Sequence, residues 1–457
     1  MVMALIQNPA FFFLILPAFL LLYHVIGRFT SLQNLFLLFV SLLFYSWGNL
    51  TNGLLLIFLI TIDFLAVKSW NSTGQKKKFI LYLAVAGNIC IWSAYKFFTP
   101  SLPEVFTAVY PVGISYFMLK KLAFLLNQFR RKENRTWTLV EYGVFVSFFP
   151  QILSGPVQLP ESFFKQINDK KPLPIETILL SAKLFVLGFL KKVAIADNMG
   201  LLVNRVFQLE NPSLLMAFTG ALGFSVQLFA DFSAYTDISR GVSILLGFDP
   251  PKNFNAPFLA VSPQDFWNRW HITLSAWLRT YIFNPVRRKL IRAMPDARGL
   301  QVALPALITM LASGLWHGNT PKFLIWGLYQ GLILIGFRAL ENVFGKIAPN
   351  RAFLFLKWLL TFVLMMAGWL LFRGSSVQWV IDIFINSRPG FSGDEFVTAV
   401  SILSMVFMYS LPLILYRLID GAGKAKRTLE PLYFALAAVI LLVFSASGVQ
   451  DFLYFEF

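Results

Sequence analysis

Histidine is scarce in this sequence, so each imidazole can be weighed as a candidate for acid–base chemistry. The 457 residues include three histidines, His24, His271 and His317. Imidazole titrates near neutral pH and is the side chain most often used as a general base. His317 follows Trp316 in SGLWHGN (313–319), where two flanking glycines would let backbone or substrate come close. His317 is therefore a catalytic candidate or a turn residue, whereas His24, near the end of the first apolar segment, is expected to pack.

The sequence gives poor support for a metal site, a nucleophilic serine or a phosphate-binding loop. The chain has no His-x-x-His or Glu-x-x-His pair and one cysteine, Cys90, so we predict no metal site and no intrachain disulfide. It also has no Gly-x-Ser-x-Gly elbow and no glycine loop that could cradle a phosphate. The remaining chemistry is general-base catalysis by one or two histidines without a metal.

The composition indicates that helices in a membrane must position these histidines. Hydrophobic residues make up 57% of the chain and charged residues 13%, about half the charged share of a soluble globular protein. The mean hydropathy is +0.67. Disordered, collagen-like and disulfide-scaffold classes are excluded by the same composition. We predict an all-α, polytopic membrane protein.

Uncharged runs locate the helices that cross the membrane. A crossing helix needs about 20 apolar residues, and on this basis we predict roughly ten to twelve transmembrane helices, with re-entrant or interfacial helices besides. We treat the chain as one transmembrane domain in three parts: N-terminal helices in 1–110, a catalytic core in 111–341 and C-terminal helices in 342–457.

Basic residues give the expected orientation. The chain has 39 Lys and Arg against 22 Asp and Glu, a net charge of +17, and the basic residues gather in four short clusters between apolar runs. We read them as orienting helices and meeting anionic lipid, not as binding nucleic acid. Placing all four clusters in the cytoplasm puts both termini outside. The third cluster comprises Arg287, Arg288, Lys289, Arg292 and Arg298.

The middle of the chain is the most irregular part. The stretch GFDPPKNFNAPF (247–258) cannot form a straight helix. Irregular backbone at membrane depth persists only where protein buries it or a cavity solvates it, so we expect a cavity nearby. Asp231 and Asp237 precede it in apolar surroundings, and we expect both to be structural, with Asp237 paired to Arg240 at i, i+3.

His271 lies in a segment with the periodicity of an amphipathic helix. Ser262 and Asp265 have the spacing of a helix cap and a first-turn acid. We therefore predict one helix over 264–283, at the membrane interface or packed under the bundle, with His271 as an anchor residue or a functional one. The apolar stripe of that helix comprises Trp267, Trp270, His271, Leu274, Trp277, Leu278 and Tyr281.

Several blocks of the chain closely resemble the membrane-bound O-acyltransferase family in order and spacing. They are DFSAYTDISRG (231–241), GFDPPKNFNAPF, DFWNRWHITLSAWLR (265–279) and SGLWHGN followed by WGLYQG (326–331). Within the family the chain is similar to the bacterial alginate O-acetylation branch. Relatives of that branch acetylate peptidoglycan and cellulose, or transfer D-alanine to teichoic acid.

The resemblance implies roles for the two histidines. His317 would be the essential base and His271 a supporting residue that hydrogen-bonds the donor carbonyl or orients the acceptor. A central funnel would let a cytoplasmic thioester, acetyl-CoA or another acyl thioester, meet an acceptor at the outer face. No cofactor would be permanently bound, and an extracytoplasmic acetyltransferase would be the partner protein.

The substrate site is expected to include three further residues, Trp316, Asn268 and Asn255. One departure from the family pattern stands beside them. Relatives usually read Arg-Asp-Tyr where this chain has Arg279 followed by threonine and tyrosine, so a carboxylate is missing. Its loss weakens any expectation of pKa tuning or partner contact at that position.

Two classes of function compete for this chain. The first is O-acetylation of an extracellular or cell-wall polysaccharide across a bacterial inner membrane, with D-alanyl, lipid or protein acylation as variants of the same chemistry. The second is a secondary transporter or flippase that uses the histidines as a proton relay. The composition suits both, but only the first accounts for the WNRWH and SGLWHGN blocks.

Overall fold

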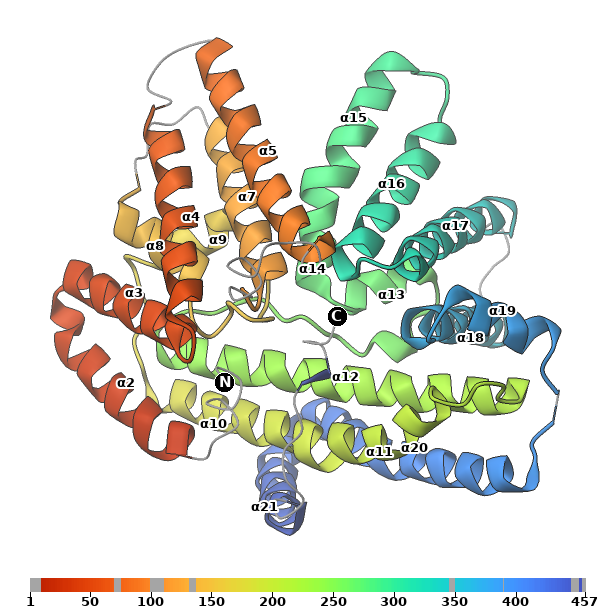
Figure 1. Ribbon diagram of the computed structural model, residues 1–457. Coiled ribbons are helices and arrows are strands. Elements are labelled where there is room, and N and C mark those ends of the chain that lie inside the picture. Colours follow the sequence, from red (N-terminus) through yellow and green to blue (C-terminus); the bar gives the residue numbers. More distant parts are fainter. Residues whose placement is uncertain are drawn as a thin grey trace. The chain divides into compact units, whose positions relative to one another are not determined.

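The computed structural model describes residues 10–69, 75–98, 111–130, 137–344, 350–388, 390–444 and 452–453, and the regular elements in these residues are helices (Figure 1). Nine of them are long and apolar enough to cross a membrane, and Thr30–Ser46 is a shorter apolar helix of 17 residues. The all-α, multi-pass membrane class is confirmed. The described residues supply a number of spans just below the predicted range.

The chain divides into two compact units. Unit 1 comprises Met1–Leu184 and Ile238–Pro251, and unit 2 comprises Phe185–Asp237 and Lys252–Phe457. Unit 2 contains two of the three histidines, His271 and His317. Each unit is described by itself below.

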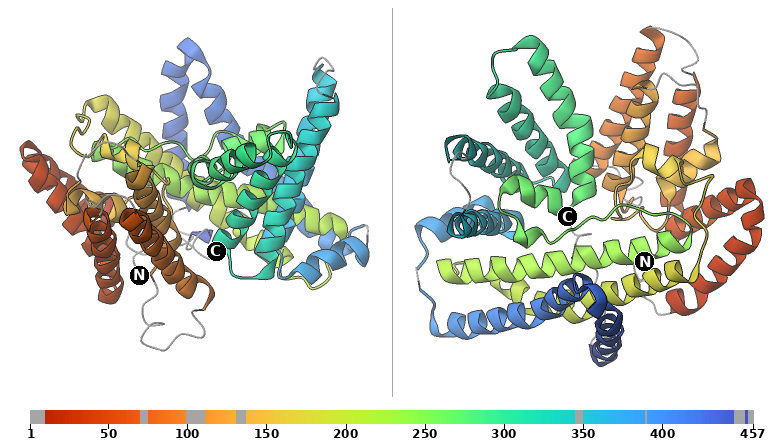
Figure 2. Two further views of the ribbon diagram at one scale, coloured as in Figure 1. Left: turned by 90° about the horizontal axis from the view of Figure 1, so that it is seen from above. Right: turned by 180° about the vertical axis from the view of Figure 1, so that it is seen from behind.

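Unit 1 is built around α3, which packs on α8, and around the side-by-side helices α4, α5 and α7 (Figures 1 and 2). Its main elements are α2 (Leu16–Val25), α3 (Thr30–Ser46), α4 (Leu50–Lys68), α5 (Gln75–Phe97), α7 (Ile114–Arg130), α8 (Leu139–Ser147), α9 (Pro160–Phe164) and most of α10 (Ile175–Phe189). A buried carboxylate holds four of them together. Asp63 of α4 accepts hydrogen bonds from Asn88 of α5 and Tyr142 of α8, and lies 3.5 Å from Lys121 of α7.

The last two turns of α12 (Leu214–Leu245) also belong to unit 1, and side chains of α2 cap the end of this helix. Tyr23 donates from its hydroxyl to the carbonyl of Leu246 at 3.0 Å, and His24 donates from Nε2 to the carbonyl of Leu245 at 2.9 Å. The last carbonyls of a helix have no partner within the helix, so these side chains satisfy them. His24 thus makes a structural contact within unit 1, and its expected lack of a catalytic role stays a prediction.

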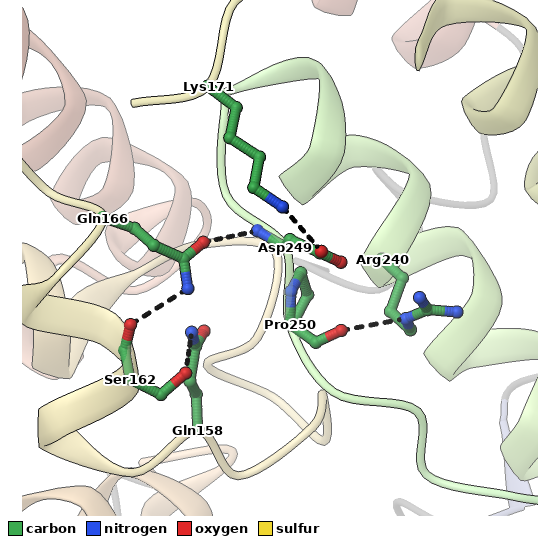
Figure 3. A network of polar contacts seen from close by, with 7 residues as sticks. All are labelled: Gln158, Ser162, Gln166, Lys171, Arg240, Asp249 and Pro250. Atoms are coloured by element: carbon green, nitrogen blue, oxygen red, sulfur yellow. Dashed lines mark hydrogen bonds and ion pairs between the residues drawn. The ribbon is translucent and has the colours of Figure 1, made fainter. Parts of the chain in front are cut away.

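A polar network anchors the start of the irregular segment after α12 (Figure 3). Gln166 accepts a hydrogen bond from the backbone N–H of Asp249, whose carboxylate lies 2.9 Å from Lys171. Arg240 donates from Nε to the carbonyl of Pro250 at 3.1 Å. The segment is irregular as predicted, and its first residues are held by side chains of unit 1.

Unit 2 contains α11 (Asp197–Val206) and the body of α12, which run alongside α20 (Gly393–Asp420) (Figures 1 and 2). A helical hairpin, α15 (Asn284–Ala293) and α16 (Leu300–His317), continues into α17 (Pro321–Phe344). The other main elements are η5 (Leu190–Ala196), α13 (Pro263–Arg269), α14 (Ile272–Leu278), η7 (Arg279–Phe283), α18 (Arg351–Arg373), α19 (Val377–Ile385) and α21 (Lys426–Phe444).

The acids of α12 are structural, but one predicted pair is wrong. Asp231 lies 2.9 Å from the buried ammonium of Lys192, which also contacts Asp197 at 2.8 Å. Asp237 pairs with Lys191 at 2.6 Å, and Arg240 bonds to the backbone as described above, so the expected Asp237–Arg240 pair does not form. The i, i+3 spacing permits such a pair but cannot exclude a better partner on another element.

Candidate active site

His271 stands at a break between two short helices, not within one long helix. Ser262 caps α13 by accepting from the backbone N–H of Asp265 at 3.0 Å, as its spacing predicted. The helix then ends at Arg269, and His271 adopts a left-handed conformation with φ of 43° before α14 begins at Ile272. The prediction of a continuous helix over 264–283 is wrong at this residue.

The break has a physical cause in the irregular segment upstream. The N–H of Ile272 donates to the carbonyl of Asn253 at 2.9 Å, and the N–H of Asn255 donates to the carbonyl of Arg269 at 2.9 Å. In a continuous helix the N–H of Ile272 would instead donate to the carbonyl four residues before it. The extended segment therefore supplies backbone hydrogen bonds that would otherwise form within the helix, and the backbone changes direction at His271.

Most of the apolar stripe is buried as the periodicity predicted, even though the helix is broken; Trp267 is half-buried. Trp270, Leu274, Trp277, Leu278 and Tyr281 are buried, and His271 is 1% exposed. Burial holds the pKa of the His271 imidazole well below its usual value, and the charge of His317 lowers it further. His271 is therefore neutral at physiological pH.

His317 is the last residue of α16 and sits in an aromatic cage. Its ring centroid lies 4.8 Å from that of Trp316, 5.2 Å from that of Trp326 and 5.2 Å from that of Phe372, each ring at a steep angle to it. Trp316 also contacts the His271 ring at 6.1 Å. Trp316 thus lies against both histidines, which are 46 positions apart in the sequence.

The glycines near His317 serve the helix packing. A Cβ on Gly314 would overlap the carbonyl oxygen of Phe323, and one on Gly327 would overlap that of Met310. The backbones of α16 and α17 therefore touch at this crossing. Of the two expectations for the glycines flanking His317, close approach by backbone is what the structure shows at Gly314, whereas at Gly318 the close neighbour is the ring of Phe323.

A cavity of about 190 Å³ in unit 2 is lined by residues of the same helices that carry or adjoin the two histidines, although neither histidine lines it. It is lined by Leu274 and Ser275, which follow His271 on α14, and by Ser313, one turn before His317 on α16. Trp267 also lines it, and its buried indole Nε1 has no hydrogen-bond partner among the residues that the structure describes. Because an unsatisfied buried N–H is costly, this donor is available to a substrate oxygen.

A second, more polar cavity of about 530 Å³ adjoins the first. The two share four lining residues, of which Arg338 carries charge, and Arg279 lines the first cavity alone. Arg287 and Arg298, from the third basic cluster, line the second. The arginines of the second cavity would attract an anionic molecule, and the first cavity could take an apolar part of it.

The remaining candidate residues have other positions. Asn268 is exposed and accepts a hydrogen bond from Nη2 of Arg279 at 2.6 Å, so it orients an arginine of the cavity without lining the cavity itself. Asn255 is exposed, and its backbone, not its side chain, bonds at the helix break. Neither side chain joins the two histidines.

Sequence reasoning missed Asn253, which is buried and bonds directly to His271. A polar residue within an irregular stretch that is rich in proline and phenylalanine was the available signal. It also missed Trp267 as a donor and Arg338 as a cavity residue, because both look like ordinary members of helical faces in the sequence.

Comparison with known proteins places this arrangement in a family. The family model of the membrane-bound O-acyltransferases matches residues 37–377, a range that includes both histidines and both cavities. The probable alginate O-acetylase AlgI of Pseudomonas aeruginosa is 32% identical over 389 residues, covering 81% of this chain and 72% of the relative.

Two further relatives are named for different activities. The peptidoglycan O-acetyltransferase of Helicobacter pylori is 28% identical, covering 85% of this chain and 80% of its own. The teichoic acid D-alanyltransferase of Bacillus subtilis is 28% identical, covering 80% and 97%. Acyl transfer is common to all three names, and this chain belongs to the membrane-bound O-acyltransferase family, as a multi-pass membrane enzyme.

Proposed function

We propose that this enzyme transfers acetyl groups from a cytoplasmic thioester to the hydroxyls of an extracellular or cell-wall polysaccharide, in the inner membrane of a bacterium. The observation that carries the proposal is the pair of adjoining cavities in unit 2. The second cavity is basic, and the first one is lined by residues within about one helical turn of His271 and His317 in the sequence. The acetyl group and the polysaccharide acceptor follow the names of the alginate and peptidoglycan relatives.

The donor is an acyl thioester, with acetyl-CoA as the first choice. Its phosphates would pair with Arg287, Arg298 and Arg338 in the second cavity, since guanidinium groups bind phosphate oxygens in a fixed geometry. Its pantetheine arm would extend through the narrower, apolar cavity toward the histidines. The second cavity would face the cytoplasm, in keeping with the orientation expected from the third basic cluster.

The transfer needs a base, a nucleophile and a group that stabilises the developing oxyanion. His317 would take the proton of the acceptor hydroxyl as its oxygen attacks the thioester carbonyl, and would return it to the departing thiolate. Trp267 would donate its indole N–H to the carbonyl oxygen as negative charge develops there. The aromatic cage around His317 would exclude water that could otherwise hydrolyse the thioester.

Acceptor and partner define the variants of this proposal. A second, extracytoplasmic acetyltransferase would complete transfer to the polysaccharide, with D-alanyl, lipid or protein acylation as the alternatives. Membership of an acyltransferase family favours an enzyme over the transporter considered above.

Purified protein incubated with acetyl-CoA labelled in the acetyl group tests the proposal. Release of labelled acetate or transfer to an added polysaccharide, lost in a His317→Ala variant, would support it. A D-alanyl carrier protein and long-chain acyl-CoA serve as competing donors. Transport of solute in liposomes with no turnover of any thioester would contradict it.

A further inference from the structure

The side chain of Asn253 lies at the centre of the helix break and contacts His271 directly. Its Oδ1 is 3.1 Å from Nδ1 of His271, 3.2 Å from the backbone N of Thr273 and 2.9 Å from Oγ1 of Thr273. All three residues are buried. One oxygen therefore gathers three hydrogen bonds at the start of α14.

These contacts determine which nitrogen of His271 carries the proton. The backbone N–H of Thr273 can only donate, so the atom that faces it must be the amide oxygen of Asn253 and not the amide nitrogen. An amide oxygen can only accept, so Nδ1 of His271 must donate to it. A neutral imidazole has a single N–H, and the lone pair is then on Nε2.

The neutral state follows from the surroundings of the ring. His271 packs against Phe232 of α12 and Trp316 of α16, and its Nδ1 contacts Oδ1 of Asn253. Among the described residues, the titratable group that acts on His271 is His317, which disfavours a second positive charge. Burial and this repulsion both lower the pKa of His271.

We propose that Asn253 is a positioning residue that fixes His271 as the Nδ1–H tautomer, so that Nε2 accepts a hydrogen bond from the acceptor hydroxyl. The inference rests on the proposed function for the identity of that hydroxyl. It separates the two roles expected of His271. A lone pair on Nε2 can orient an O–H but cannot donate to the thioester carbonyl, which instead takes its hydrogen bond from another group such as Trp267.

The tautomer can be measured without any turnover, by nitrogen NMR of protein labelled with ¹⁵N-histidine. With three histidines in the chain, His24→Gln and His317→Gln variants assign the signals. We expect wild-type His271 to show a protonated Nδ1 and a bare Nε2 at neutral pH. In Asn253→Leu, which has no acceptor, the Nε2–H tautomer should appear. A wild-type proton on Nε2, or an unchanged tautomer in Asn253→Leu, would overturn the proposal.

The rate of acyl transfer provides a second test of the proposal. Asn253→Leu should lower kcat by about 10²-fold with little change in the KM for the donor, because the acceptor is misoriented but the donor cavity is intact. Thr273→Val is the matched control: it removes one hydrogen bond from the same oxygen but retains the N–H and the His271 contact. The control should keep the Nδ1–H tautomer, and a loss equal to that of Asn253→Leu with the tautomer kept would argue for packing alone.

The variant Asn253→Asp provides a second test if Asn253→Leu fails to fold. Its carboxylate still accepts from Nδ1 but stabilises the imidazolium, which raises the pKa of His271. Activity needs neutral His271 and is lost as the pH falls through that pKa, so the loss should begin at higher pH, by about one unit for each 1.4 kcal/mol of stabilisation. An unchanged His271 titration in this variant would contradict the proposal. Absence of thioester turnover in the wild type would defeat the proposed function, and the NMR result would still decide the tautomer.

Discussion

Replacement of His317 by alanine should abolish acyl transfer, and the structure lets the chemical and packing effects be separated. Losing a general base costs about 10²–10⁴ in rate, which corresponds to about 2.7–5.4 kcal/mol of transition-state free energy. His317 has no histidine neighbour in its own helix that could replace it, and His271 is reserved as a hydrogen-bond acceptor in our proposal. We therefore expect a loss of at least about 10²-fold.

The same substitution also removes a buried ring. His317 is 7% exposed and contacts three aromatic rings at 4.8–5.2 Å, so His317→Ala leaves a hole between α16 and α18. Truncation of a large buried aromatic side chain costs about 3–5 kcal/mol, and the smaller imidazole should cost less. His317→Phe keeps a ring in the cage and no base. Both variants should be inactive, but His317→Phe should retain more of the thermal stability.

The assay is transfer of labelled acetyl, normalised to protein that elutes as a monodisperse peak, with the melting temperature of each variant measured in parallel. Inactivity of both variants, with a large loss of melting temperature in His317→Ala alone, would assign the effect to the missing base. Retention of about a third of the wild-type rate by His317→Phe would refute the general-base role. A threefold loss of rate is far smaller than the loss of about 10²-fold or more expected when a general base is removed.

The other substitutions test the remaining parts of the site. His271→Ala should reduce transfer less than His317→Ala, and His24→Ala should leave transfer unchanged while costing about 1 kcal/mol of stability through its bond to α12, as measured by activity and by thermal melting. Arg338→Gln should raise the KM for acetyl-CoA by about tenfold or more at constant kcat and weaken its salt dependence, and an unchanged KM would place the phosphates elsewhere. Trp267→Phe should lower kcat by about 10²-fold if its N–H supports the oxyanion, and equal rates would exclude that role.

Much of the fold could be predicted because the amino-acid composition and the periodicity of hydrophobic residues indicate membrane helices. The paucity of charge predicted the all-α membrane class, and the i, i+3, i+4 stripe after Asp265 predicted which side chains would be buried. The N-cap at Ser262 and the irregular course of 247–258 also follow from local chemistry, since proline and the cap residues act within a few positions. These predictions depend only on neighbours in the chain.

The features that could not be predicted depend on partners far away in the sequence. The periodicity of hydrophobic side chains does not reveal the helix break at His271, because buried residues continue on both sides of it. Only the backbone changes there, where the N–H of Ile272 donates to Asn253 and not within the helix. The Asp237–Arg240 pair failed for the same reason: Lys191, on another element, contacts Asp237 instead. The role of the glycines around His317 was ambiguous until α17 was seen to touch α16.

The break at His271 links the backbone to the chemistry proposed for the side chain. A left-handed conformation costs a residue with a side chain about 1–2 kcal/mol, and such strain persists only where surrounding structure over-determines it. Here Asn253 does so twice, with its carbonyl accepting from Ile272 and its side-chain oxygen accepting from Nδ1 of His271. In an unbroken helix the first of these bonds would be lost to the intrahelical partner, and the second would lose the backbone register that supports it. The strained turn is therefore the means by which an asparagine 18 positions upstream can set the proton of a buried imidazole.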